Sequence, residues 1–399
     1  MFAGVPNKPL PYETPWTASL EERLAALQAR RPCRALWLYD KPDASTFRYR
    51  VFNIVESLMG DPEARVAASW FTEPEIPVIE DVVEGVDVVV LCRFPYTPPL
   101  ARLVARAKAA GVRVLFDCDD LVFDSRYVPL IAETLDQDIR APAVWDFWFA
   151  YVGRREASMR LCDGGIATNP FLAKKLSDAL GGKPVGIVPN FLNRRQQRAS
   201  LELLKMKRES AWKRDGRVTI GYFSGTPSHN RDFRIIIPAL VRLLETNPHV
   251  DLRVVGFLDI KDELSDYAER IEVLPFEDFM NLQRLIAGVE VNIVPLQQND
   301  FTDCKSELKF FEAACVGTWT VATPTNTYRA AISHGETGLL AHAHEWDRRL
   351  QQAVELASSP SVYAAAAERA AQFAFSSYGW NGFSGRIAAA LQEAGARYH

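Results

Sequence analysis

The sequence lacks the features that mark secreted, membrane-spanning and nucleic-acid-binding proteins. Its six cysteines are scattered and include no C-x-x-C pair, which favours reduced thiols in a cytoplasmic protein over a disulfide framework. The start, MFAGVPNKPLPYETPW, has no signal-peptide pattern, and no uninterrupted apolar stretch approaches the ~18 residues of a spanning helix. The net charge of −4 gives no general reason to expect nucleic acid as a partner. We therefore expect a cytoplasmic protein.

Two segments differ from this background. Between residues 194 and 217 there are nine Lys or Arg and only three Asp or Glu, which is typical of a solvated segment between domains. Contact with an anionic membrane surface is the alternative. The aromatic segment VWDFWFAYV (144–152) is interrupted by Asp146, and we interpret it as a buried helix, with membrane contact as the alternative. A peripheral position at the inner face of the membrane therefore stays open.

The order of apolar segments predicts an α/β fold. A chain of 399 residues is too long for one ordinary core, so two domains are expected. Strand-like runs alternate with helical patterns, and this alternation predicts parallel sheets. The expected strands are 33–40, 86–94, 112–120, the run from residue 163, 184–191, 216–225, 250–259, 271–276, 290–297 and 318–324. The expected helices include 100–111, 231–248, 277–289 and 304–317. Two doubly wound domains joined near residue 193 follow from this order.

Two loops of the second domain are suited to bind phosphate. In doubly wound sheets, ligands bind beyond the carboxyl ends of the strands, at helix N-termini. The segment GYFSGTPSHNRDF leaves one strand through Gly225 and contains His229, and QQNDFTDCKSELKFFEAACVG leaves another strand. Both offer small residues, backbone N–H groups and nearby basic side chains, which together can cradle phosphate.

The helical pattern over 304–317 carries a charged face. At 100° per residue, Lys305, Lys309 and Glu312 fall within about 60° of one another. Alone, such a face is typical of a solvated helix. Beside two phosphate-binding loops, it is suited to hold an anionic ligand.

The second domain resembles the nucleotide-sugar domain of retaining glycosyltransferases with the GT-B fold, notably glycosyltransferase family 4. The resemblance rests on KSELKFFEAACVG, TWTVATP and TNTYRAAISHGETGLLA, which keep the family's order of a Glu-Ala helix with a closing glycine, a short strand, a proline turn and G-x-T-G-L-L. It extends upstream to VGIVPNF and is loose over the first 110 residues. The resemblance implies two Rossmann-like domains facing across a cleft. Residues 1–193 would form the acceptor side and 194–370 the nucleotide-sugar side, and a helix in 371–399 would pack back towards the first domain.

The resemblance also implies a donor site. Glu312 corresponds to the family's second motif glutamate, which binds the ribose hydroxyls, and a carboxylate can accept from two vicinal O–H groups. We expect Glu312 on a face open to the cleft. Ser306, Leu308 and Lys309 lie where backbone N–H groups meet the diphosphate. Phe276 ends the turn that faces the base.

Two positions depart from the family pattern. Thr226 and Arg231 lie where the family usually has an Arg and a Lys that neutralise the phosphates. The glutamate expected eight residues before Glu312 is Cys304, with Asp303 beside it. We hypothesise that Lys305 and Lys309 supply the missing positive charge.

In the first domain the resemblance places Asp119 where many family members have a histidine. Asp117-Cys118-Asp119 is also a D-x-D, which metal-dependent transferases use, but we discount that role because the phosphate loops lie in the other domain. A capping aspartate after a strand is the structural alternative. Arg48 or Arg50 could contact an acceptor phosphate, with a surface salt bridge as the alternative, and Asp120 is assigned to the acceptor side.

These observations predict transfer of a sugar from a nucleotide diphosphate-sugar to a glycan, lipid-linked or protein acceptor. The resemblance implies retention through front-side attack, with Asp119, Arg231 and Lys309 as catalytic residues and loop N–H groups stabilising the leaving diphosphate. No metal or other cofactor is expected, and His342 and His344 lack the further ligands of a zinc site. The alternative is a catalytically inert sugar-nucleotide-binding or assembly subunit, which the missing glutamate and arginine favour.

Overall fold

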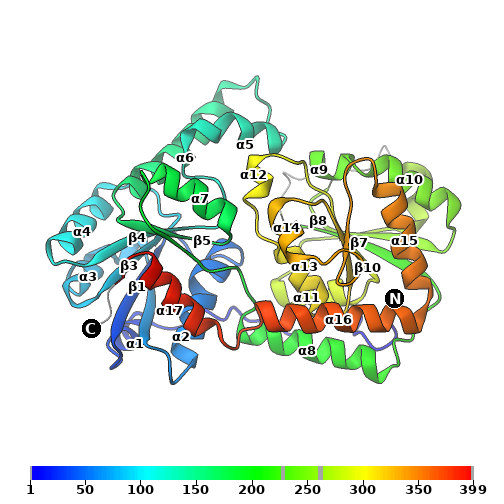
Figure 1. The fold of residues 1–399 in the computed structure, drawn as a ribbon, viewed down its shortest axis with the longest axis horizontal. Helices are drawn as coiled ribbons and strands as arrows, with labels where there is room; N and C mark the ends of the chain where they lie inside the picture. The colour runs from blue at the N-terminus through cyan, green and yellow to red at the C-terminus, as the bar shows by residue number, and fades with distance from the viewer. Residues whose placement is uncertain (1, 226–229, 259–263, 397–399) are drawn as a thin grey trace.

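The computed structural model describes residues 2–225, 230–258 and 264–396, which form two domains lying side by side (Figure 1). Each domain contains a six-stranded sheet whose paired strands all run parallel. This confirms the predicted pair of doubly wound α/β domains. Thr226 and His229 lie outside the described residues. Within the described ranges, no helix combines the length and apolar character needed to cross a membrane.

The sheet of the first domain has the order β2-β1-β3-β4-β5-β6. Its central strands are continuous apolar runs because helices cover both faces, and β3 is buried at every position. The strands are β1 (Cys33–Tyr39), β2 (Val66–Thr72), β3 (Val88–Cys92), β4 (Arg113–Cys118), β5 (Gly164–Ala167) and β6 (Val185–Ile187).

The helices of the first domain begin at polar caps or prolines, as the sequence suggests. Thr97 caps α4 before two prolines, and Asn169 caps α7 before one, each accepting a hydrogen bond from a backbone N–H of the first turn. The helices are α1 (Leu20–Leu27), α2 (Asn53–Gly60), α3 (Ile76–Glu80), α4 (Pro98–Ala109), α5 (Val128–Thr134), α6 (Pro142–Arg160) and α7 (Pro170–Ala179). Shorter turns are the π-helix η1 (Arg48–Phe52) and the 3-10 turns η2 (Glu73–Glu75), η3 (Val83–Gly85) and η4 (Ser125–Tyr127).

The sheet of the second domain has the order β12-β11-β10-β7-β8-β9. Its strands are β7 (Val218–Ser224), β8 (Val250–Gly256), β9 (Ile271–Leu274), β10 (Val291–Val294), β11 (Trp319–Ala322) and β12 (Leu339–Leu340). The helices before β11 are α8 (Arg194–Glu209), α9 (Asn230–Arg234), α10 (Ile237–Thr246), the 3-10 helix η6 (Ser265–Arg270), α11 (Phe279–Ala287), α12 (Asp300–Asp303) and α13 (Leu308–Ala314). The last helices are α14 (Asn326–Ala331), α15 (Trp346–Ser358), α16 (Pro360–Tyr378) and α17 (Phe383–Glu393).

Three expectations from the sequence are corrected. The strands β2 and β12 were not predicted. The expected helix over 304–317 is shorter, because α12 ends at Asp303 and α13 begins only at Leu308. The aromatic helix α6 is not buried in its first half, where Phe147 is 57% exposed and Phe149 is 47% exposed.

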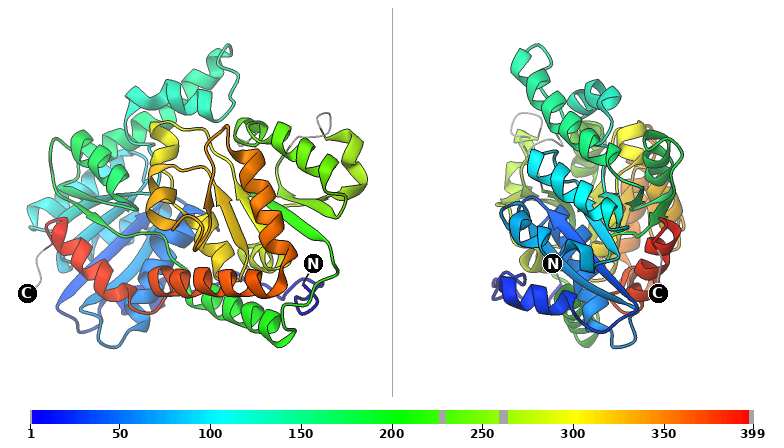
Figure 2. Two further views of the ribbon diagram at one scale, coloured as in Figure 1. Left: turned by 45° about the vertical axis from the view of Figure 1, so that its right-hand side comes forward. Right: turned by 90° about the vertical axis from the view of Figure 1, so that its left-hand side faces the viewer.

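The two ends of the chain exchange domains. Helix α16 runs along the second domain, and the chain then crosses to the first domain, where α17 packs (Figure 2). Gly186 of β6 permits this contact, because a Cβ there would lie 2.1 Å from the carbonyl oxygen of Ala390. Conversely, Phe2 near the start of the chain packs in the core of the second domain, against the rings of Trp212 and Tyr363.

The basic helix α8 follows the crossing at Asn193 and packs on the second domain rather than standing free. Lys207 is fully buried and donates to the carbonyl of Gly317 at 3.1 Å. Arg208 pairs with Glu368 on α16. Much of the positive charge between residues 194 and 217 is therefore committed to contacts within the protein.

Candidate functional site

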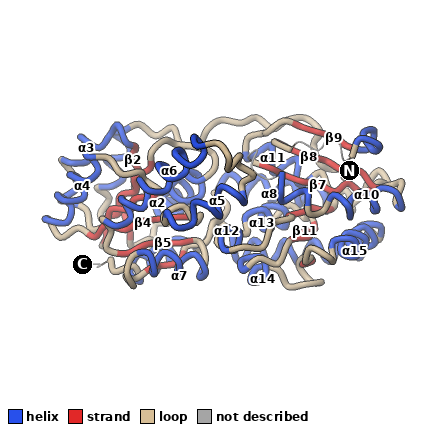
Figure 3. The backbone as a smooth tube through the Cα atoms, turned by 90° about the horizontal axis from the view of Figure 1, so that it is seen from above, coloured by secondary structure: helices blue, strands red, loops and turns tan. Residues whose placement is uncertain are grey.

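A cavity of about 740 Å³ lies in the cleft between the domains, and both domains line it. The strand orders explain its position. In the first sheet the order reverses between β1 and β3, and in the second between β7 and β10. Loops diverge at such switch points and leave a crevice beyond the carboxyl ends of the strands. Seen from above, α12 of the second domain lies beside α5 of the first (Figure 3). Lining residues include Thr46, Arg48, Tyr49, Arg93, Asp119, Asp120, Ser224, Gly225, Phe276, Lys305, Ser306, Leu308, Lys309 and Glu312.

Glu312 on α13 contributes to the cavity wall but is held by the first domain. Its Oε1 accepts from the hydroxyl of Tyr49, from Nε2 of Gln196 at 2.9 Å and from Nη2 of Arg48 at 3.5 Å. The residue is only 3% exposed. The prediction that Glu312 stands on a face open to the cleft is therefore wrong in this respect, although its place at the cavity agrees with the predicted donor site.

Lys309 lies one turn before Glu312 and also lines the cavity. Its Nζ lies 5.3 Å from the centroid of the Tyr222 ring. Burial lowers the pKa of Lys309 to about 8, partly offset by the carboxylate of Asp232. A lysine whose charge is poorly solvated is suited to receive a phosphate, because the anion replaces the missing solvation.

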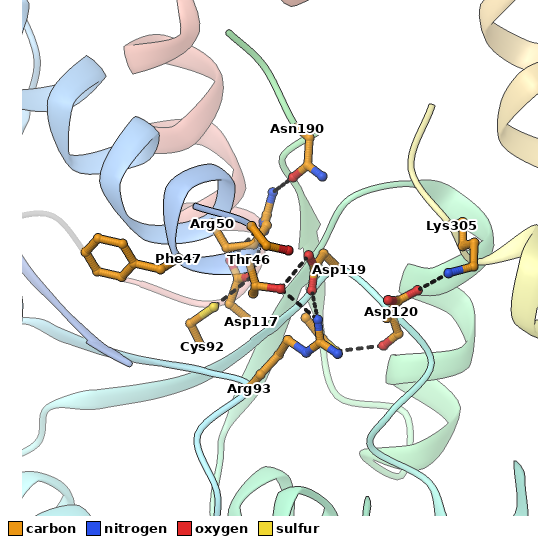
Figure 4. A network of polar contacts seen from close by, with 12 residues as sticks. Thr46, Phe47, Arg50, Cys92, Arg93, Asp117, Asp119, Asp120, Asn190 and Lys305 are labelled. Atoms are coloured by element: carbon orange, nitrogen blue, oxygen red, sulfur yellow. Dashed lines mark hydrogen bonds and ion pairs between the residues drawn. The ribbon is translucent and has the colours of Figure 1, made fainter. Parts of the chain in front are cut away.

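Lys305 precedes α13 and faces the first domain. Its Nζ lies 3.7 Å from Oδ1 of Asp120, and the contact crosses the cleft (Figure 4). Ser306 and Leu308, at the start of α13, also line the cavity, so the structure brings this predicted phosphate segment to one wall. The first N–H groups of a helix have no acceptors within it and are available to a ligand or solvent.

The two residues at the missing first glutamate do not line the cavity. Cys304 is fully buried in the hydrophobic core of the first domain, and its carbonyl accepts from Nδ2 of Asn169 at 3.0 Å. Asp303 accepts from the backbone N–H of Asn326 at 2.6 Å, at the start of α14. At this position the chain uses domain packing and helix capping in place of a ligand-facing carboxylate.

Arg231 is found outside the cavity wall. Its Nε lies 2.9 Å from Oδ1 of Asp136 in the first domain, and its Nη1 donates to the carbonyl of Glu133 at 2.7 Å. The structure therefore gives Arg231 an interdomain role rather than a position at the predicted phosphate site.

Two aromatic rings stand where the sequence predicts the base-facing turn. Phe276 lines the cavity and is 50% exposed. The ring of Phe257 is stacked on it, with centroids 6.3 Å apart and planes inclined by 23°. Such a half-exposed pair offers an apolar platform for a planar ligand group.

Asp119, at the end of β4, faces the cavity and is held by Arg93 (Figure 4). Nη1 of Arg93 donates to Asp119 at 2.9 Å and to the hydroxyl of Thr46 at 2.8 Å. Arg93 follows β3 with a φ of 45°, in the left-handed region where a residue with a side chain is uncommon. Arg93 could not be recognised from the sequence, because its place depends on the alignment of β3 beside β4.

Asp117, the other carboxylate of the D-x-D, is fully buried and is not among the residues that line the cavity. Arg50 donates to both of its oxygens at 2.8 Å, and both side chains are fully buried. Asp117 and Arg50 are therefore a structural pair, and the idea that Arg50 touches an acceptor is wrong. Arg48 is also buried, so the surface salt bridge considered for it is excluded.

No group of three or more His, Cys, Asp or Glu side chains suited to a metal ion occurs in residues 2–225, 230–258 and 264–396. His342 and His344 stack on each other, with ring centroids 6.1 Å apart.

Comparisons with known proteins agree with this architecture. Residues 217–359, in the second domain, match the family model described as Glycosyl transferases group 1. No curated protein sequence matches the chain. A similar solved structure is Alr3699/HepE of Anabaena in complex with UDP and glucose, with 14% identity and a TM-score of 0.58, covering 90% of this chain and 99% of that one.

Two further structures have the same two-domain fold. A glycosyltransferase from Rickettsia africae ESF-5 is 10% identical with a TM-score of 0.58, covering 91% of this chain and 99% of its own. The sucrose-phosphate synthase of Thermosynechococcus elongatus is 13% identical with a TM-score of 0.57, covering 90% and 98%. At these identities the likeness shows the fold.

Proposed function

We propose that the protein is a glycosyltransferase that moves a sugar from a nucleotide diphosphate-sugar to an acceptor. One observation carries this proposal: a single cavity between two sheet ends brings Lys305, Lys309 and Glu312 to one wall and Asp119 to the other. The three residues of the second domain fall within the segment that matches the glycosyltransferase family model. The cavity volume of about 740 Å³ lies within the range of pockets that enclose most of a ligand, roughly 300–1,000 Å³.

In this proposal the wall formed by the second domain binds the nucleotide. Glu312 accepts from the ribose hydroxyls, and Phe276 lies against the base. Lys309, with Lys305, neutralises the diphosphate, since Arg231 is engaged with Asp136 outside the cavity. Preorganised positive charge beside the departing diphosphate stabilises its developing negative charge, and such electrostatic stabilisation is usually the largest contribution to catalysis.

During transfer, the bond between the anomeric carbon and the diphosphate oxygen breaks, and a bond to the acceptor hydroxyl forms. The acceptor proton leaves with the diphosphate. Retention of configuration is supported by the sequence resemblance alone. Asp119, held by Arg93, faces the side from which the acceptor enters, and Asp120 stands beside it.

The acceptor side suggests an acceptor carried on a lipid, with the protein at a bilayer surface. On α6, Trp148 and Tyr151 line the cavity, and the same helix exposes Phe147 and Phe149. Aromatic side chains therefore continue from the cavity to the outside, and aromatic rings favour the membrane interface. We assign membrane contact to α6 rather than to α8, whose basic residues are largely engaged.

The proposal is tested by incubating the protein with a panel of UDP-, GDP-, ADP- and dTDP-sugars and a membrane extract as acceptor source. We expect one donor to release its nucleoside diphosphate and to label the extract. UDP-glucose is the first choice, because a protein of the same fold has been crystallised with it. Binding without turnover would support the inert sugar-nucleotide-binding subunit instead, and no binding to any nucleotide would refute both functions.

A further inference from the structure

The two oxygens of the Glu312 carboxylate differ in their hydrogen bonds. Tyr49 and Arg48 of the π-helix η1 and Gln196 of α8 all donate to one oxygen, Oε1. Among the residues that the structure describes, no hydrogen bond to Oε2 is found. A carboxylate has about four acceptor positions over its two oxygens, so Oε2 keeps the capacity to accept from two hydroxyl groups.

The three donors are themselves fixed. The guanidinium of Arg48 lies 4.0 Å from the centroid of the Tyr49 ring, and its Nη1 donates to Oε1 of Gln196 at 3.0 Å. The Tyr49 ring packs edge-on against Phe311, at 6.3 Å. Burial raises the pKa of Tyr49 well above its ordinary value, so the hydroxyl keeps its proton and can donate. The rotamer of Glu312 is thus set by a rigid group, most of which belongs to the first domain.

We infer that Tyr49 and Arg48 are positioning residues that aim the free oxygen of Glu312 at the nucleotide ribose, so that nucleotide binding requires the contact between the domains. This inference rests on the proposed function, because it assigns the ribose to Glu312. It adds that the donor site is not complete within the second domain. By linkage, a nucleotide that binds Glu312 strengthens the interdomain contact to the same degree as the contact strengthens nucleotide binding.

The alternative, in which Tyr49 blocks the site, makes the opposite prediction. If the Tyr49 hydroxyl occupied the position of a ribose hydroxyl, its removal would tighten nucleotide binding. The arrangement of all three donors on Oε1 favours positioning over blocking, because the oxygen that would serve the ligand is the other one.

The test is Tyr49→Phe, which removes the hydroxyl and keeps the ring against Phe311. Calorimetric affinities are measured for the nucleoside diphosphate that binds the wild type best among UDP, GDP and ADP, and for its 2′,3′-dideoxy analogue. In the wild type we expect the analogue to bind roughly 10- to 100-fold more weakly, since two hydrogen bonds to a carboxylate are lost. In Tyr49→Phe we expect the parent nucleotide to weaken about 5- to 10-fold and the analogue to change less than about 2-fold.

The matched control is Tyr151→Phe, which removes a hydroxyl from the same cavity on the acceptor side. It should leave the ratio between nucleotide and analogue unchanged. An equal ratio in the wild type and Tyr49→Phe, or tighter binding by Tyr49→Phe, would overturn the inference while leaving the glycosyltransferase proposal intact. Absence of nucleotide binding by the wild type would overturn the proposed function first. Because the readout is a ratio, a general loss of stability in the variant cannot imitate the expected result.

Discussion

Replacing Lys309 by methionine should make the ligand-free protein more stable and its binding of diphosphate weaker. Burial lowers the pKa of Lys309 from 10.5 to about 8. At pH 7 the lysine is charged in both the folded and the unfolded chain, so the folded state carries the full cost of a poorly solvated ammonium group. One pKa unit corresponds to about 1.4 kcal/mol, so the free energy of unfolding should rise by up to about 3 kcal/mol in Lys309→Met.

The sign of this effect depends on pH in a defined window. Below about pH 8 both states hold the proton, and the difference between Lys309→Met and the wild type is largest. Between about 8 and 10.5 the folded wild type loses the proton while the unfolded chain keeps it, so wild-type stability rises relative to the variant. Above 10.5 both states are neutral, and this contribution to the difference disappears. Scanning calorimetry of thermal unfolding at pH 7 and pH 10 measures how far the difference in stability between Lys309→Met and the wild type decreases.

Ligand binding supplies the second half of the prediction. A diphosphate near the ammonium group raises its pKa again, so binding at pH 8 should take up a fraction of a proton, which calorimetry in two buffers of different ionisation enthalpy detects. Lys309→Met should lose about 2 kcal/mol of diphosphate affinity, roughly 30-fold, and keep its affinity for the bare nucleoside.

Lys305→Met is the matched control for stability. Its ammonium group has a carboxylate partner, Asp120, across the cleft. Removing Lys305 should therefore not stabilise the protein. A Lys309→Met variant that is no more stable than the wild type at pH 7 and binds diphosphate equally well would contradict both the burial cost and the phosphate role of Lys309.

Three other perturbations test separate parts of the structure. Glu312→Gln keeps the shape of the side chain and should weaken nucleotide binding about 10-fold by titration calorimetry; an unchanged affinity would remove the ribose assignment. Asp117→Ala leaves its arginine partner buried without a counter-charge and should lower the free energy of unfolding by about 3–5 kcal/mol in urea titration; an effect under about 1 kcal/mol would contradict a buried structural pair. The wild type should float with phosphatidylcholine vesicles, and salt should not change this binding. The double variant Phe147→Ser with Phe149→Ser should no longer float, whereas Val362→Ser on α16 should still do so. If the wild type binds no vesicles but is a dimer, and the double variant is a monomer, this face would instead bind a second copy of the chain.

The sequence predicted the sheets well where a strand was a contiguous apolar run. It failed for β2, whose Ala-Ala-Ser core is weakly apolar, and for β12, whose two residues become a strand only by pairing with β11. The charged segment was predicted as one helix, but an Asn299–Thr302 capping box forms a separate short turn before it. The strands β2 and β12 depend on pairing with other strands, whereas the capping box is a local feature that the helical spacing did not indicate.

The candidate site divides in the same way. Lys309 and Glu312 could be found from helical spacing and a local motif, since they lie on one element. Tyr49 is 263 positions from Glu312 in the sequence, and Gln196 is 116 positions from it. No local sequence pattern therefore predicts these two contacts. For α6, the aromatic composition predicted a buried helix, and this prediction is wrong for its first half, where Phe147 and Phe149 are exposed.

The exchange of chain ends between the domains bears on how the protein is made. The core of the first domain includes Phe383, Ile387 and Leu391, which are synthesised after the second domain. Although domains usually fold in order during synthesis, the first domain here can complete its core only after the second domain and α17 have been synthesised. Phe2 and Val5, by contrast, must wait through the synthesis of the whole first domain before their partners exist. A nascent chain that lacks α17 would thus expose apolar surface of the first domain, so dependence on chaperones should last until α17 has been synthesised.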